Sequence, residues 1–349
     1  MTNAVSKING LTGLANLGNT CFLNSCMQVL SNLDDLNKIF SLKESLINER
    51  LSDKNNKLYS SALLTNEWVE LKNLMWSKNC VISPGKFVKN VQKIAMEKDR
   101  DIFTGYAQND LPEFLLFIFE SFNEALSTKV SVIISGTEQN ETDILAKKSY
   151  NMIKTLYEKE YSPLLDLFYG ISVSTIMSEN GKLLSTTPEP FMMLSLPLPE
   201  EKNITLESCI NLYCKKEKLD GENAWLNDKT NEKEVVSKGI LFWSLPNILI
   251  IDLKRFTNGM RKRQDLINIP LDDLDLTSYV IGYNRRAYIY DLHAVCNHEG
   301  GMMGGHYTST IRKEDGKWYN YNDTTVKEVP KSRVISSKAY CLFYKKKHL

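Results

Sequence analysis

The hydrophobic and polar positions divide the chain into two parts with different periodicity. Up to about residue 161, apolar residues recur at the three- and four-residue spacing of amphipathic helices, in 25–40, 66–76, 83–94 and 109–126. From about residue 167, short runs of β-branched and aromatic residues are separated by Gly, Pro and Asn, which is typical of strands. We therefore predict a helical first half and a β-rich second half.

The β-rich half contains seven clear strand patterns and one helical interruption. The strands are expected in 167–177, 191–198, 247–256, 287–298, 306–312, 317–322 and 339–346. A helix is expected over 205–219, and the polar stretch 135–143 predicts a loop that is too short to separate independent domains. We find no internal repeat.

Composition narrows the class of protein. The chain has 349 residues, enough for one large core or two modest ones. Its formal net charge of +1 lacks the basic excess expected of a nucleic-acid-binding protein. No leader and no apolar stretch of membrane-spanning length is found, so we expect no membrane partner. Seven cysteines without a regular framework favour a reducing compartment, and hence an intracellular protein of the cytoplasm or nucleus.

One cysteine stands where a reactive thiol is expected. In the stretch GLANLGNTCFLNSCMQVL, Cys21 begins a predicted helix directly after a turn made by Gly18 and Asn19. The free N–H groups and dipole of a helix start stabilise an anion, so we expect a lowered pKa and a thiolate at Cys21. Asn16 is placed to donate its amide to an oxyanion near the sulfur. Cys26, inside the helix, is expected to be a small buried hydrophobe.

A nucleophilic cysteine needs a base, and the chain has four histidines. His348 lies in a charged tail and His293 within a strand pattern, so both are poor candidates. His298 and His306 flank a glycine-rich stretch whose backbone a narrow substrate can approach closely. Because His306 opens a predicted strand, which is a rigid support, it is the preferred base.

The third member of a Cys–His pair is expected on the next strand. After a hairpin, the chain returns alongside His306 with Asn322 and Asp323 side by side. The order Cys, His, Asn is that of papain-like thiol hydrolases, in which the third group orients the imidazole. Neighbouring strand residues face opposite sides, so only one of the two can face His306 in regular geometry.

Four motifs resemble those of the ubiquitin-specific proteases. The stretch around Cys21 resembles their cysteine box, and HAVCNHEGGMMGGHYTSTIRKEDGKWYNYNDTTVKEV resembles their histidine box. QNDLPEFL at 108–115 is similar to their Q-x-D-x-x-E-F motif, and LPNILIIDLKRF at 245–256 to their L-K-R-F strand. The motifs occur in the family's order and extend over residues 13–344.

The resemblance implies a cysteine peptidase that hydrolyses the amide, usually an isopeptide, after the C-terminal glycine of ubiquitin. It implies Cys21 as the nucleophile, His306 as the base, Asn322 as the orienting residue and Asn16 as the oxyanion donor. Spacing from the tryptophan of the histidine box selects Asn322, and Asp323 assists either in the oxyanion hole or in orienting the histidine. Ubiquitin and ubiquitin-conjugated proteins would be the partners.

The same resemblance implies a set of residues that contact the substrate. Gln108, Asp110 and Glu113 belong to the motif that meets the extended tail of ubiquitin, and carboxylates suit a tail that contains arginine. Gly305 and Tyr307 would line the channel for that tail. Without the motif, Glu113 would be interpreted as a solvated charge on an amphipathic helix.

The family fold is α+β and papain-like, with a helical thumb, a β-rich palm and extended β-fingers. We expect a tail at 1–10 and one catalytic domain at 11–346, with the thumb at about 11–161 and fingers and palm at about 162–346. A monomer is expected. The architecture implied by the resemblance agrees with the helical and β-rich halves of the sequence.

The chain departs from the family at the zinc site of the fingers. Many members bind zinc through two C-x-x-C pairs, but the corresponding places here hold Met177 and Asn180 and a second stretch without cysteine. Cys209 and Cys214 are five residues apart on a predicted helix and point in different directions. We expect no zinc and no other cofactor.

Two alternative functions stay open at this point. A protease for a ubiquitin-like modifier would carry the same catalytic boxes, because the surface that contacts the body of the modifier lies in the fingers. An inactive ubiquitin-binding scaffold is disfavoured because this sequence retains every catalytic residue of the boxes.

Overall fold

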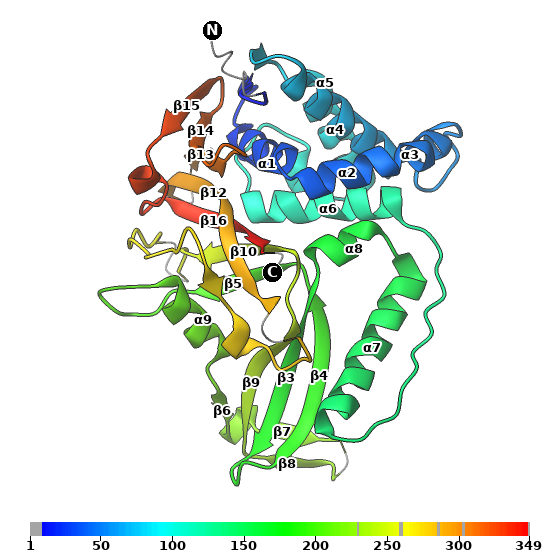
Figure 1. Cartoon of the computed structure of the whole chain (residues 1–349), viewed down its shortest axis with the longest axis vertical. Coiled ribbons are helices and arrows are strands. Elements are labelled where there is room, and N and C mark those ends of the chain that lie inside the picture. The colour runs from blue at the N-terminus through cyan, green and yellow to red at the C-terminus, as the bar shows by residue number, and fades with distance from the viewer. Residues whose placement is uncertain (1–8, 229, 258–260, 285–286, 302–303, 348–349) are drawn as a thin grey trace, which may run out of the picture.

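The helices between residues 21 and 126 form one lobe, the thumb, in the computed structural model (Figure 1). The structure describes residues 9–228, 230–257, 261–284, 287–301 and 304–347. The helices are α1 (Cys21–Ser31), α2 (Asp34–Leu42), α3 (Glu44–Leu51), α4 (Tyr59–Ser77), α5 (Gly85–Glu97), α6 (Leu111–Leu126), α7 (Glu141–Glu160), α8 (Pro163–Phe168) and, in the second half, α9 (Leu206–Cys214). The predicted α+β fold is confirmed.

Helix α1 lies between other thumb helices and the palm sheet. Every residue of α1 is buried, the polar ones included, because the helix lies between other thumb helices and strand β13 (Gly304–Arg312). Its apolar side packs into the thumb, where the rings of Phe22 and Phe114 meet edge to face with centroids 5.1 Å apart. The first residue of α1 is Cys21, so the fold holds this thiol at the junction of the two lobes.

The second half builds the palm around one large sheet (Figure 1). Its strand order is β15-β14-β13-β12-β16-β10-β5, and β11 pairs with β12 outside this order. All pairings are antiparallel except β10 with β5. The remaining bounds are β5 (Met193–Pro197), β10 (Ile248–Lys254), β11 (Leu274–Asp275), β12 (Ile289–Gly301), β14 (Trp318–Asn322), β15 (Thr325–Val329) and β16 (Ala339–Lys346).

The two faces of the palm sheet belong to two different hydrophobic cores. On β10, Ile248 and Ile250 join the core shared with the thumb, whereas Leu249 and Ile251 join a second core that includes α9 residues. This alternation follows from the period of two in a strand, and it explains the nearly continuous apolar run at this position in the sequence. The thumb-facing core, which includes Cys21, holds the two lobes together.

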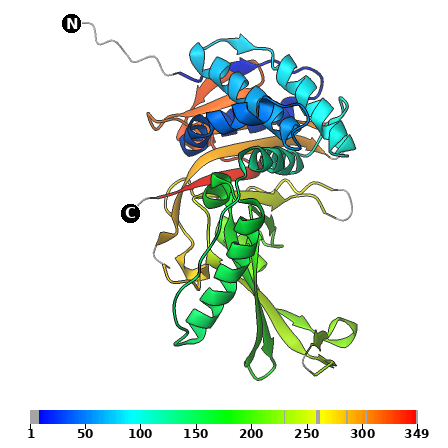
Figure 2. The same ribbon diagram turned by 90° about the vertical axis from the view of Figure 1, so that its right-hand side faces the viewer.

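A four-stranded sheet forms the fingers and extends away from the thumb (Figure 2). Its order is β4-β3-β9-β6, and the pair β7-β8 lies near its far end in Figure 1. Helix α7 packs along β4, so it flanks the fingers. The bounds are β3 (Gly170–Ser178), β4 (Leu183–Phe191), β6 (Glu217–Leu219), β7 (Trp225–Asn227), β8 (Glu232–Glu234) and β9 (Val236–Ser244).

The helix predicted over 205–219 is longer than the observed one, because its last residues form strand β6. Helix α9 begins after Thr205, whose side chain and that of Ser208 cap each other reciprocally, but it ends at Cys214. Lys215 is already extended, with φ −60° and ψ 133°, and β6 then pairs with β9. The prediction was wrong for the last residues because pairing with the fingers sheet outweighs the local helical preference of a lysine-rich segment.

Candidate active site

The segment before α1 is fixed against the hairpin that joins β14 to β15. The backbone N–H of Leu14 donates to the carbonyl of Asp323 at 2.8 Å. A Cβ on Gly13 would lie 2.3 Å from the carbonyl oxygen of Thr324, so only glycine allows this approach. The start of α1 at Cys21 and the end of β14 at Asn322, 301 residues apart in the chain, are thereby held in one place.

A tight turn then aims the chain into α1. Gly18 and Asn19 have positive φ values of 102° and 55°, as expected of the residue types that tolerate this conformation. The side-chain oxygen of Asn16 accepts hydrogen bonds from the backbone N–H groups of Gly18 at 3.2 Å and Thr20 at 3.1 Å. These bonds fix the amide of Asn16 beside the helix start.

Cys21 is nearly inaccessible, with 1% of its surface exposed. Burial raises the pKa of its thiol above the ordinary value, hydrogen bonding from the backbone of Tyr307 lowers the pKa, and the negative charge of Asp323 raises it again. The sequence-based expectation of a lowered pKa from the helix start alone is therefore wrong for the free protein. Desolvation of the charged form outweighs the helix dipole at this depth.

His306 is oriented by Asn322. Nε2 of His306 lies 2.7 Å from Oδ1 of Asn322. Because an amide oxygen only accepts, Nε2 must carry the proton, which leaves Nδ1 as the acceptor in the neutral ring. Within the described residues, no hydrogen bond joins this ring to Cys21. The structure thus brings Asn322, and not Asp323, to the imidazole.

Asp323 instead binds two asparagine amides on the thumb side. Its Oδ2 accepts from Nδ2 of Asn16 at 3.0 Å, and its Oδ1 accepts from Nδ2 of Asn24 at 2.8 Å. Asp323 has a positive φ of 47° in the turn that follows β14, which rotates its side chain away from the His306 side. The two candidates for the third position therefore face different partners.

Sequence reasoning missed Asn24. It lies one turn after Cys21 on α1, is buried, and also donates to the carbonyls of Leu14 and Ala15 at 3.3 Å. The available signal was a polar residue on a helix whose other residues are mostly apolar, because a buried amide needs partners. Its contacts tie α1, the preceding segment and Asp323 together.

Gln108 spans from the thumb to the palm. Its side-chain amide donates to the carbonyl of Gly305 and accepts from the N–H of the same glycine. Strand β14 pairs with β13 only from Ser309 onward, so the edge of β13 at Gly305 is not covered by a strand. A peptide that pairs with this edge has to displace the amide of Gln108.

The other residues of the Q-x-D motif have different environments. Asp110 caps α6 by accepting from the N–H of Glu113 at 3.2 Å, and its other oxygen accepts from the hydroxyl of Tyr340 at 2.6 Å. Burial raises the pKa of Asp110. Asp110 thus joins the thumb to the palm, while the side chain of Glu113 is exposed.

His298 supports the strand that carries the candidate base. Its ring stacks on that of Tyr307 with centroids 4.4 Å apart, and a Cβ on Gly305 would lie 2.2 Å from its Nε2. Its Nδ1 lies 2.9 Å from the ammonium nitrogen of Lys262. Burial and this neighbouring cation lower the pKa of His298 to about 4, so the ring is neutral and structural.

The fingers do not offer the donor set of a zinc site. Met177 lies on β3 with its sulfur 3.2 Å from the ammonium nitrogen of Lys216, and Asn180 lies in the turn between β3 and β4. Cys209 is buried in the second palm core, and Cys214 packs against that core. In the described part of the chain, no three His, Cys, Asp or Glu side chains are grouped to hold a metal.

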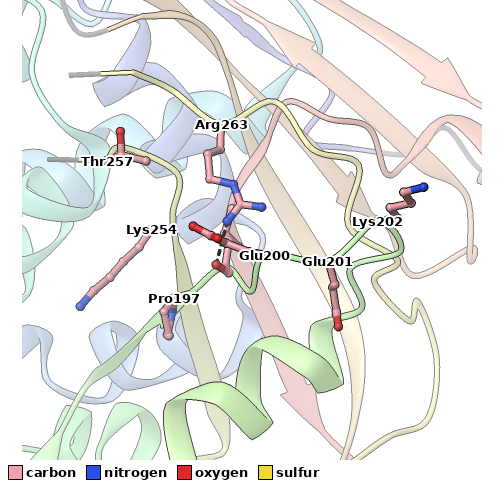
Figure 3. Close-up of a pocket in the computed structure, with 8 residues that line it drawn as sticks. Pro197, Glu200, Glu201, Lys202, Lys254, Thr257 and Arg263 are labelled. Atoms are coloured by element: carbon pink, nitrogen blue, oxygen red, sulfur yellow. Dashed lines mark hydrogen bonds between the residues drawn. The ribbon is translucent and has the colours of Figure 1, made fainter. Parts of the chain in front are cut away.

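A separate pocket of about 580 Å³ lies between the loop that follows β5 and the segment that follows β10 (Figure 3). Arg263 lines it, but its guanidinium already donates to the carbonyls of Leu198 at 2.7 Å and Pro199 at 2.9 Å. None of the candidate catalytic residues lines this pocket.

No helix in the described residues has the length and apolar content to cross a membrane.

Sequence comparison finds one family over nearly the whole chain. The sequence model of the family described as Ubiquitin carboxyl-terminal hydrolase matches residues 12–344. Ubiquitin carboxyl-terminal hydrolase 2 of Bos taurus is 34% identical over 343 residues, which cover 96% of this chain and 55% of that protein. The chain thus spans about half the length of the bovine relative. The Gallus gallus protein of the same name is 35% identical over 348 residues, covering 97% of this chain and 94% of the relative.

Structural comparison finds the same fold in a multisubunit assembly. The SAGA Ubp8/Sgf11/Sus1/Sgf73 DUB module bound to ubiquitin aldehyde contains a chain that superposes with a TM-score of 0.73. The match covers all of this chain and 72% of that one, at 21% sequence identity. At this identity, the similarity establishes the fold.

Proposed function

The chain belongs to the ubiquitin carboxyl-terminal hydrolase family, and on this premise we propose that it is a deubiquitinase. It hydrolyses the isopeptide or peptide bond that follows the C-terminal glycine of ubiquitin, using Cys21 as the nucleophile. The observation that supports this most directly is the convergence of the two boxes. The hairpin that carries Asn322 and Asp323 is bonded to the segment that leads into Cys21.

The proposed reaction uses His306 as base and then as acid. Nδ1 of the neutral ring takes the thiol proton, and the sulfur of Cys21 attacks the carbonyl carbon of the glycine. The imidazolium then gives this proton to the departing lysine amine, and a thioester remains on the sulfur. Water hydrolyses the thioester by the same route, which restores the thiol. Asn322 holds the ring in the required tautomer through the 2.7 Å hydrogen bond.

Asn16 is proposed as the donor to the oxyanion. Its Oδ1 accepts from the turn before α1, and one N–H of its Nδ2 donates to Asp323. An amide nitrogen carries two protons, so one N–H stays available for the negative oxygen of the tetrahedral intermediate. Asp323 is then a positioning residue, which keeps the amide aimed without touching the substrate.

Activation of Cys21 is proposed to depend on the substrate. Burial disfavours a thiolate in the free protein, and the nearby charge of Asp323 adds to this effect. Entry of the tail between thumb and palm has to displace Gln108 from Gly305 and brings the scissile carbonyl to the sulfur. Proton transfer to His306 then occurs together with binding, so Cys21 of the free enzyme reacts more slowly with oxidants and alkylating agents at neutral pH than an ordinary thiol.

The tail is proposed to run along the free edge of β13, past Gly305 and Tyr307. Gln108 occupies this edge in the free protein, and the exposed carboxylate of Glu113 is available to bind a cationic side chain of the tail. The partly buried Asp110 stabilises the junction of α6 with the palm through Tyr340 and also adds negative potential.

The catalytic groups all come from one chain, which is consistent with a monomer. All seven cysteines, each within the described residues, are free thiols. We propose an intracellular location in the cytoplasm or nucleus on this basis, because free thiols persist in reducing compartments.

A panel of modifiers tests the function. Ubiquitin and several ubiquitin-like proteins are each joined through the C-terminus to a fluorogenic amine and incubated with the protein and with Cys21→Ala. The proposal expects hydrolysis of the ubiquitin amide by the unmodified protein alone. If only a ubiquitin-like modifier is cleaved, that modifier and not ubiquitin is the substrate. If no modifier is cleaved, the result favours a binding scaffold.

A further inference from the structure

A polar pocket of about 310 Å³ lies beside the candidate base and the residue that orients it. His306 and Asn322 both line it, and the face of the sheet that carries them continues with Thr308 on β13 and Asn320 on β14. These four positions share one face because strand residues two apart point to the same side. The segment after β15 closes the pocket through its 3-10 turn at 331–333 and the residues that follow.

Two features of the lining point to a ligand. The side chain of Asn297 is 8% exposed, and its Oδ1 has no hydrogen-bond partner. The guanidinium of Arg333, in the described part of the chain, makes no ion pair or hydrogen bond, whereas Lys338 is paired with Glu299 at 2.7 Å. The pocket therefore offers one uncompensated positive charge and a buried amide oxygen without a partner, while the amide nitrogen of Asn297 donates to Thr310 at 3.5 Å.

The reaction itself places part of the substrate next to this pocket. The leaving lysine amine has to receive a proton from His306, so the polypeptide that carries this lysine must pass the imidazole. Neither Gln108 nor Gly305, where we place the ubiquitin tail, lines the pocket. A chain on the leaving side can therefore enter it without competing for the edge of β13.

We propose that this pocket is a subsite for the leaving polypeptide, and that Arg333 selects an acidic residue next to the modified lysine. The inference rests on the proposed deubiquitinase function and names a substrate feature for it. Glu or Asp would pair with the guanidinium at the rim, while the hydroxyl and amide groups of the wall accept and donate to the peptide backbone.

Three substrates separate this inference from the function it rests on. Ubiquitin is joined either to a small fluorogenic amine, or by an isopeptide to the lysine of a five-residue peptide with two Glu or with two Gln flanking that lysine. The readout is the ratio of kcat/KM for the Glu peptide to that for the Gln peptide, measured for the unmodified protein, Arg333→Gln and Arg333→Glu. Lys327→Gln is the matched control, because Lys327 is an exposed cation on β15 that does not line the pocket.

We expect the unmodified protein to prefer the Glu peptide by about two- to fivefold, the range for a partly exposed ion pair. Arg333→Gln should bring the ratio to about one, Arg333→Glu should invert it, and Lys327→Gln should keep the preference. A ratio of one in the unmodified protein, or an equal loss in Lys327→Gln and Arg333→Gln, would overturn the subsite. If the small ubiquitin amide is not cleaved at all, the proposed function itself fails.

Discussion

Asn322 accepts a hydrogen bond from Nε2 of His306 at 2.7 Å, and this contact fixes which nitrogen of the ring can act as a base. Removing the amide should leave the imidazole free to rotate and to adopt the other tautomer. We expect Asn322→Ala to lower kcat for a ubiquitin amide by about ten- to a thousandfold, a value scaled down from that of the acid–base group itself because Asn322 only orients it.

The conservative variant tests the same contact. A carboxylate accepts the same Nε2 proton, so Asn322→Asp should retain most of the activity. Full activity of Asn322→Ala would show that His306 does not depend on this partner.

Asp323 should affect the acidity of Cys21 rather than the orientation of the base. Its negative charge disfavours the thiolate, so Asp323→Asn should lower the pKa of Cys21. The measurement is the rate of Cys21 alkylation by iodoacetamide in the free protein as a function of pH, with the modified cysteine identified by mass spectrometry. The curve should move to lower pH.

Asp315→Asn serves as the control for the Asp323 variant, because Asp315 is exposed in the turn between β13 and β14 and is not among the charges that shift the pKa of Cys21. Its alkylation curve should coincide with that of the unmodified protein. A curve for Asp323→Asn that stays in place, or moves to higher pH, would contradict the electrostatic assignment.

Gln108 should oppose substrate entry. Gln108→Ala frees the N–H and carbonyl of Gly305, so KM for a ubiquitin amide should fall by about two- to tenfold, the net value of one or two hydrogen bonds. Asn109→Ala is the control, since among the described residues that side chain bonds only to the carbonyl of Ala107 in its own loop. A rise in KM for Gln108→Ala would mean that this amide binds the tail instead of guarding its path.

His298 should make stability depend on pH. Its pKa is about 4 in the fold and 6.5 in an unfolded chain. The contribution of its neutral ring to the free energy of unfolding is therefore complete above pH 6.5 and is lost as the pH falls toward 4. The loss is up to about 3 kcal/mol at pH 4 by linkage. His298→Phe keeps an aromatic ring against Tyr307 without a titrating group.

Urea unfolding at several pH values checks this prediction. The free energy of unfolding of His298→Phe should fall less steeply between pH 6.5 and 4 than that of the unmodified protein. His293, whose burial also lowers its pKa to about 4, is present in both proteins, so the difference between the curves isolates His298. Parallel curves would contradict the assignment.

The division into helices and strands follows from patterns that are local in the chain. Periodicities of 3.6 and 2 located the thumb helices and the palm strands, because each element must bury one face. The failures occur where tertiary pairing decides. The end of α9 is set by pairing of β6 with β9, and the sequence alone carries no signal of that register.

The sequence could predict which residues form the candidate site, but not the contacts that these residues make. Spacing and motif order selected Cys21, His306 and Asn322, while the partnership of Asp323 with Asn24 and the buried setting of the thiol depend on segments far apart in sequence. The pKa of Cys21 shows why this matters. A helix start is visible in the sequence, but the depth of burial that outweighs its dipole is a property of the assembled lobes.

The central claim is that Cys21 makes the covalent bond to ubiquitin. A ubiquitin derivative with an electrophile in place of its C-terminal carboxylate is incubated with the protein, and the adduct is mapped by mass spectrometry. The account predicts one adduct, on Cys21, with no labelling of Cys21→Ala even though that variant still binds ubiquitin. An adduct on the exposed Cys80, on Cys26 or on any other thiol would contradict it.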